Sequence, residues 1–148
     1  MSDSGTLAAV QAEIIAALSS PAIQAGMPIL PAMSLEDLIN KQALRTPAMG
    51  IIYLGTTNAM VYAIGSRMLR ATTKWRVAIS NSNMRGTQDA RQDTYALLEK
   101  VRDQLHFSRS AQSPKALFLF QEEQCPDNQP EGKIVAYQDF YLDLILGK

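Results

Sequence analysis

Cysteine and histidine are almost absent from this 148-residue sequence, which contains Cys125 and His106 and no others. A single cysteine excludes a disulfide within the chain, and its turn-like surroundings favour a free thiol in a reducing compartment over a nucleophile. One cysteine and one histidine do not make a zinc site, and no serine or cysteine nucleophile has a local context that points to the histidine. The glycines form neither a phosphate-binding loop nor a dinucleotide fingerprint. The sequence therefore predicts no catalytic residue, no metal site and no cofactor.

Long apolar runs are also absent. No stretch approaches the ~18 apolar residues of a membrane span, so no membrane contact is expected. The N-terminal residues lack a basic segment followed by an apolar core, so we expect no secretory signal. Charged residues make up only 19% of the chain and the formal net charge is zero, which leaves less protection against self-association. This composition suits a subunit of an assembly, although many soluble monomers share it.

Acidic residues are missing between residues 41 and 76, and this segment holds six basic ones. Residues 1–40 hold four acids and no base, and residues 110–148 hold six acids and three bases. Ordinary solvated faces are one interpretation of this asymmetry. The other is a subunit with a basic and an acidic side, which stacks or forms a ring with copies of itself, or contacts DNA with one side.

The stretch of residues 74–106 predicts the nucleus of the fold. Its first part alternates, with Trp75, Val77 and Ile79 on one side, as in a half-buried strand. A helix over residues 87–106 follows, and one apolar stripe runs along it: Ala90, Thr94, Leu97, Leu98, Val101 and Leu105. A strand followed by an amphipathic helix that folds back on it is the centre of a two-layer domain.

Local patterns predict the remaining elements. Helices are expected at residues 7–18 and 35–44, and strands at 48–54, 59–64, 67–80, 115–123 and 133–146. Breaker residues predict no regular element over residues 21–33 and a polar loop over 107–114, and Gly65 and Ser66 fit a two-residue type II′ turn. The chain is expected to form a single domain over residues 1–148, of class α/β (α+β). A mostly antiparallel sheet of four or five strands carries a long amphipathic helix on one face, with short helices near the N-terminus.

The predicted hairpin over residues 59–80 is longer than a small domain requires. A strand of ~13 residues spans about 43 Å, against a radius of gyration near ~15 Å for such a chain. The end near Gly65 is therefore expected to project and to contact neighbouring subunits, and the polar residues 81–83 are expected to end the second strand. Basic side chains share the outward side of that strand: Arg70, Lys74 and Arg76. Since residues 41–76 offer no acid to neutralise them, a basic surface is expected.

The stretch of residues 74–106 also carries a resemblance. An alternating strand that ends in a polar asparagine, then Arg85-Gly86, then a helix reading Tyr-Ala-Leu-Leu-Glu-Lys-Val-Arg, is similar to the tail terminator proteins of Mu-like phages and prophages. The similarity extends more loosely to the strand at residues 48–55 and to the two C-terminal strands. It implies a non-enzymatic subunit, by family resemblance a homohexamer. The ring caps the tail tube, stops its polymerisation and provides the surface that joins the head.

The resemblance also implies partners and a location. The partners are further copies of the chain, the tail tube protein and a head-side connector or stopper protein. DNA passes through the ring lumen without sequence-specific binding. The implied location is the tail or neck region of the virion, after assembly in the cytoplasm of a host bacterium.

The basic residues of the hairpin are the candidate interaction site, expected to face another subunit, the tube or DNA: Arg67, Arg70, Lys74 and Arg76. The alternative for these side chains is a charged edge that resists aggregation. For the whole chain, a second hypothesis is a small homo-oligomeric module of another class, such as a homodimer that binds a ligand or nucleic acid. A hydrolase built on His106 is a third hypothesis.

Overall fold

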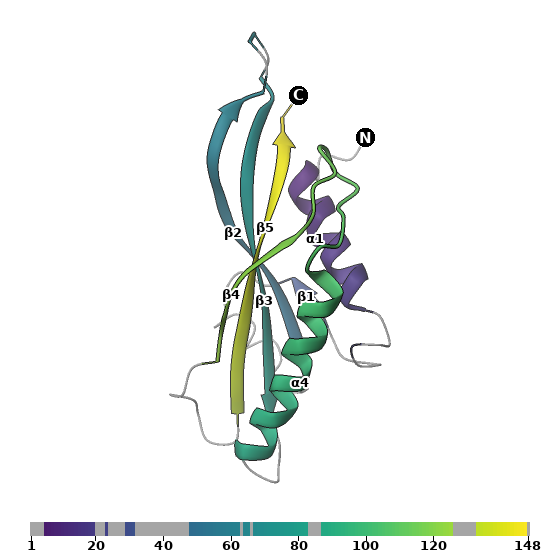
Figure 1. Cartoon of the computed structure of the whole chain (residues 1–148), viewed down its shortest axis with the longest axis vertical. Coiled ribbons are helices and arrows are strands. Elements are labelled where there is room, and N and C mark those ends of the chain that lie inside the picture. The colour runs from purple at the N-terminus through teal and green to yellow at the C-terminus, as the bar shows by residue number, and fades with distance from the viewer. Residues whose placement is uncertain are drawn as a thin grey trace.

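The computed structural model describes residues 5–19, 23, 29–31, 48–62, 64–65, 67–82, 87–125 and 133–147 (Figure 1). The elements in chain order are α1 (Gly5–Leu18), β1 (Ile29–Pro31), β2 (Ala48–Val61), β3 (Leu69–Ser82), α4 (Thr87–Leu105), β4 (Leu119–Gln124) and β5 (Lys133–Leu146). The helix predicted at residues 35–44 lies outside the described residues. Within the described part of the chain, no helix is both long and apolar enough to cross a membrane.

The strands form one sheet in the order β1-β2-β3-β5-β4. Strands β2, β3, β5 and β4 pair antiparallel, which confirms the α+β class and the antiparallel sheet. Strand β1 pairs parallel to β2, with Ile29–Pro31 beside Met49–Ile51. The prediction of no regular element over residues 21–33 is therefore wrong at this point. The breakers Pro28 and Pro31 limit the strand to three residues, too few for a periodic signal.

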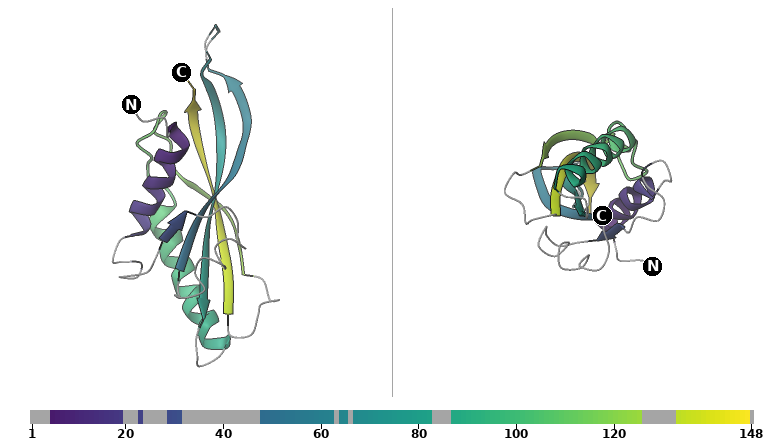
Figure 2. Two further views of the ribbon diagram at one scale, coloured as in Figure 1. Left: turned by 180° about the vertical axis from the view of Figure 1, so that it is seen from behind. Right: turned by 90° about the horizontal axis from the view of Figure 1, so that it is seen from below.

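Both helices cover the same face of the sheet, as the view from below in Figure 2 shows. The helices contribute to the core Val10, Ile14, Leu18, Leu97, Leu98, Val101 and Leu105. The sheet contributes Met49, Ile51, Trp75, Val77, Ile79, Phe140, Leu142 and Leu144. The described side chains predicted to form the apolar stripe of α4 and the inner side of β3 between Ala71 and Ile79 are therefore buried, while Leu69 at the distal end stays exposed.

A polar residue interrupts this inner face at Gln138, the exception in the alternation of β5. The side chain is fully buried. Its Nε2 donates hydrogen bonds to the Leu98 carbonyl oxygen at 2.8 Å and to Glu123 Oε1 at 2.6 Å. These two bonds satisfy the amide NH₂ group and tie β5 to α4 and β4, whereas the buried Oε1 accepts no hydrogen bond from the described residues.

The hairpin differs from the prediction in its first strand. Strand β2 runs without a break from Ala48 to Val61, where two separate strands at 48–54 and 59–64 were predicted. Its pairing with β3 shifts register at two places, beside Gly55 and Asn58, whose φ angles are 126° and 57°. The residues that suggest a break thus form irregularities within one strand, because glycine and asparagine tolerate positive φ.

Both ends of the β2–β3 pair also differ from the prediction. Strand β2 ends at Val61 and β3 begins at Leu69, so the connection is longer than the predicted two-residue turn. Tyr62 N–H donates to the Met68 carbonyl oxygen at 2.8 Å and closes this end. At the other end β3 continues through Ser82, beyond the predicted stop after residue 80, because β5 supplies a pairing partner for its last residues.

The C-terminal strand follows the prediction, and its neighbour does so in part. Strand β5 covers the predicted residues 133–146. Strand β4 begins at Leu119, later than the predicted residue 115. The preceding segment pairs with residues after the helix instead, with Phe107 N–H on the Phe118 carbonyl oxygen at 2.8 Å and Phe118 N–H on that of Ser108 at 2.9 Å. The loop predicted at residues 107–114 is thus held against the start of β4.

Candidate functional site

The pleat of β3 turns the candidate basic residues away from the helices. Arg70, Lys74 and Arg76 alternate with inner-face residues such as Trp75, which is buried in the core. Arg70 is exposed, whereas the side chains of Lys74 and Arg76 retain 30% and 22% of their exposure. The three residues share the outer face of the sheet but lie in different surroundings.

A carboxylate on β5 neutralises the basic strand, contrary to expectation. Asp139 is the register partner of Arg76 and its side chain has no exposed surface. Arg76 Nε donates to Asp139 Oδ1 at 2.8 Å and Nη2 donates to Oδ2 at 3.1 Å. Lys74 Nζ lies 3.7 Å from Asp139 Oδ2. The expectation of unneutralised charge is therefore wrong for Lys74 and Arg76, because pairing brings in an acid that is distant in the sequence.

The surroundings of Arg76 are those of a structural ion pair. Its guanidinium carbon lies 3.7 Å from the centroid of the Tyr137 ring, and the ring belongs to a small outer cluster with Ile52 and Ala78. The hydrogen bond to Asp139 raises the pKa of Arg76, although partial burial opposes the rise. Arg76 therefore remains charged and fixed, which suits sheet stability better than capture of a partner.

The remaining positive charge lies at the far end of the hairpin. Arg67 and Arg70 are exposed, and no ion pair joins either to an acid among the described residues. Large apolar side chains are exposed beside them: Met60, Val61, Tyr62, Ile64 and Leu69. We call this surface, made by these five residues with Arg67 and Arg70, the hairpin tip. In Figure 1 the β2–β3 hairpin that carries it extends past both helices and past the end of β5.

The exposure at the hairpin tip is high enough to be informative. Met60, Val61 and Tyr62 are 69%, 62% and 51% exposed, and Ile64 is fully exposed. A cluster of large exposed apolar residues marks an interaction surface more often than a single one does. The sequence predicted the projection of this end but not its uncovered apolar character, because a sequence does not say which apolar residues a neighbouring element covers.

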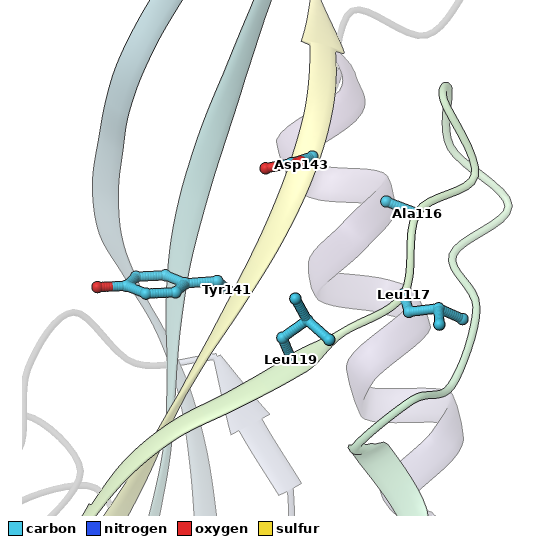
Figure 3. A pocket seen from close by; sticks show the side chains of 5 residues that line it. All are labelled: Ala116, Leu117, Leu119, Tyr141 and Asp143. Carbon is cyan, nitrogen blue, oxygen red and sulfur yellow. The ribbon is translucent and has the colours of Figure 1, made fainter.

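A shallow pocket opens on the outer side of β5. Its volume is about 240 Å³. Figure 3 shows the side chains that line it: Tyr141 and Asp143 from β5, Leu119 from the start of β4, and Ala116 and Leu117 from the segment before it. Its lining is mostly apolar, and Asp143 supplies the one charged group among these residues. We call it the outer pocket.

His106 has a structural role in the described molecule. Its Nδ1 accepts a hydrogen bond from the Phe120 N–H at 3.0 Å, and its ring stacks on Phe107 at a centroid distance of 4.0 Å. It therefore links the end of α4 to the start of β4. Cys125 is half-buried at the border of the core. Among the described residues, no group of three or more histidine, cysteine, aspartate or glutamate side chains is arranged to hold a metal ion.

Comparison with known proteins assigns neither a family nor a function to this chain. No model of a known protein family matches the chain, and no curated protein gives a significant match. The hairpin tip and the outer pocket therefore provide the structural basis for a functional proposal.

Proposed function

We propose that this chain is the tail terminator of a Mu-like phage or prophage. It is a non-enzymatic subunit that forms a ring, by family resemblance a homohexamer. The ring caps the tail tube, stops its polymerisation and offers the surface to which the head-side connector or stopper protein joins. In this proposal the protein resides in the tail or neck region of the virion and assembles in the host cytoplasm.

The observation that carries the proposal is the projecting hairpin. The helix-covered end of the sheet buries its apolar residues, whereas the hairpin tip leaves five large ones uncovered next to two arginines. A free apolar hairpin end invites aggregation unless a partner covers it. A subunit that binds copies of itself and a tail tube can bury such an end in these contacts. The exposed hairpin tip therefore agrees with the resemblance of residues 74–106 to tail terminators.

The charge distribution gives the tip its place in the proposed ring. In the proposed ring, Arg67 and Arg70 face a neighbouring subunit, the lumen or the rim that meets the tube, while Lys74 and Arg76 stabilise the sheet through Asp139. A positive rim favours an acidic tube surface and the passing DNA backbone, without reading its sequence. Since exposed charges are screened by salt, its contribution weakens as ionic strength rises.

The test is replacement of the wild type by the double variant Arg67→Gln/Arg70→Gln. The fold should be unchanged, because both side chains are exposed. Capping of tail tubes should weaken, and electron microscopy should show tails longer and more variable than normal. The control variant Lys100→Gln/Lys115→Gln removes two positive charges away from the hairpin. If the arginine variant gives uniform tails of normal length that still join heads, the charges of the hairpin tip are only a solvated face.

The outer pocket favours a second candidate function, a small homo-oligomeric module that binds a ligand. An apolar pocket of about 240 Å³ with one carboxylate has the chemistry of a ligand site. The native mass of the protein, alone and with tail tube protein, separates the two candidates. A tail terminator associates with tube ends, whereas a ligand-binding module does not bind them.

A further inference from the structure

One surface of the molecule, the hairpin tip, carries exposed apolar side chains, and another, the outer pocket, is hollow with a mostly apolar lining. Ile64 of the hairpin tip is fully exposed and belongs to the connection between β2 and β3, past the pairing of Leu69 with Leu146 of β5. The outer pocket lies part-way down β5, where Asp143 pairs with Thr72 of β3. The connection that carries Ile64 precedes Leu69, which pairs with Leu146, three residues further along β5 than Asp143.

The size of the outer pocket matches one large side chain. An apolar cavity of ~150 Å³ accepts a benzene molecule, so about 240 Å³ accepts an isoleucine or tyrosine side chain. Drug-sized ligands occupy pockets of roughly 300–1,000 Å³. The pocket is therefore smaller than a site for a drug-sized ligand and large enough for one protruding protein side chain.

The charges of the two surfaces are opposite. Arg67 lies in the hairpin tip without an ion pair among the described residues. Asp143 lines the outer pocket, where its Oδ1 accepts a hydrogen bond from Thr72 Oγ1 at 2.8 Å, and no described base forms an ion pair with it. Lys74 points to the neighbouring Tyr141 ring, 5.9 Å from its centroid, and is held by Asp139. An arginine brought to this rim meets an available carboxylate, which gives orientation and partner selection.

The geometry points to head-to-tail association between copies of this chain, in which Ile64 of one copy enters the outer pocket of the next and Arg67 approaches Asp143. The chain has no net charge, so copies do not repel one another. A contact between two different surfaces of the same molecule is heterologous, and such contacts close into a ring when the rotation per subunit permits. The inference rests on the proposed function for the ring and adds the two surfaces that close it.

Two variants test the contact by mutual complementation. Ile64→Asp damages the tip and Leu119→Asp damages the pocket, and both positions are exposed, so the fold should persist. Each variant alone should lose self-association by about tenfold or more, since burial of one large apolar side chain is lost. An equimolar mixture should form heterodimers, because one intact tip meets one intact pocket. Sedimentation velocity measures the masses, and Tyr95→Asp, at an exposed apolar site on α4, should assemble like the wild type.

Charge reversal tests the same contact without removing apolar surface. Arg67→Glu and Asp143→Arg should each weaken association, and the two changes in one chain should restore most of it. A wild type that stays monomeric, variants that keep the wild-type mass, or a mixture that stays monomeric would each overturn the inference. Rings that persist in both aspartate variants would leave the tail-terminator proposal standing. Rings that depend on the contact but do not affect tail length would overturn that proposal alone.

Discussion

Replacement of Asp139 by asparagine gives the sharpest test of the ion pair between β3 and β5. The change keeps the size of the side chain and removes its charge. Asp139 has no exposed surface, and it holds Arg76 through two hydrogen bonds with Lys74 nearby. The variant therefore leaves a guanidinium, fixed over the Tyr137 ring, without its carboxylate.

The expected cost follows from burial. Removal of one partner from a buried ion pair costs roughly 3–5 kcal/mol. The Arg76 side chain keeps 22% of its exposure and can reach water, so we expect a somewhat smaller loss, about 2–4 kcal/mol. For a chain of this length, such a loss lowers the melting temperature by roughly 4–16 °C.

The assay is urea unfolding followed by circular dichroism, at one protein concentration because self-association shifts the midpoint. Asp103→Asn is the control. It changes an exposed aspartate on α4, outside the proposed contact, so it should cost under about 1 kcal/mol. Equal losses below about half a kcal/mol in both variants would refute the reasoning. Replacing both members of the pair with apolar residues, Arg76→Met/Asp139→Leu, should recover much of the stability.

Two further predictions concern the core and the histidine. Leu98→Ala should reduce the free energy of unfolding by about 2–5 kcal/mol, because a buried leucine leaves a cavity, and a loss under about half a kcal/mol in the same urea assay would contradict its burial. His106→Ala should cost about 1 kcal/mol through the lost bond to the Phe120 N–H, and it should leave ring assembly and tail capping intact. Loss of an activity without a change in folding would instead favour the hydrolase hypothesis.

The sequence predicts those parts of the fold that depend on local periodicity. The alternation of β5 locates both of its ends, because one covered face requires apolar residues at nearly every second position. The helix at Thr87–Leu105 is predicted equally well, since its apolar stripe faces the sheet. Features of this kind need no knowledge of which strands are neighbours.

The geometry of the candidate site depends on which strands lie side by side and in which register, and the sequence alone does not give this. Alternation indicates that Lys74 and Arg76 share a side of β3, but the register of β3 against β5 decides that Asp139 lies opposite. That register joins residues 63 positions apart in the chain. An absence of acids within a segment is therefore poor evidence for an uncompensated basic surface in a sheet, where charge partners come from the adjacent strand. Because Lys74 and Arg76 pair with Asp139, replacing all the basic residues of β3 together would lower stability as well as remove surface charge, and the two effects could not be separated.

The remaining difference between the prediction and the structure concerns which apolar residues of β2 are covered by neighbouring elements. Strand β2 is apolar on both sides, yet only Ala48–Ile52 is buried on both, and its distal half is exposed. Strand β1 pairs with Met49–Ile51, so among the described residues the distal part of β2 has no second neighbour. An isolated two-stranded hairpin is marginally stable in water, and this one gains support from β5 only as far as the pairing of Leu69 with Leu146. Beyond that pairing the apolar side chains are exposed in the described part of the chain, and in the contact proposed above the outer pocket of a second copy covers Ile64.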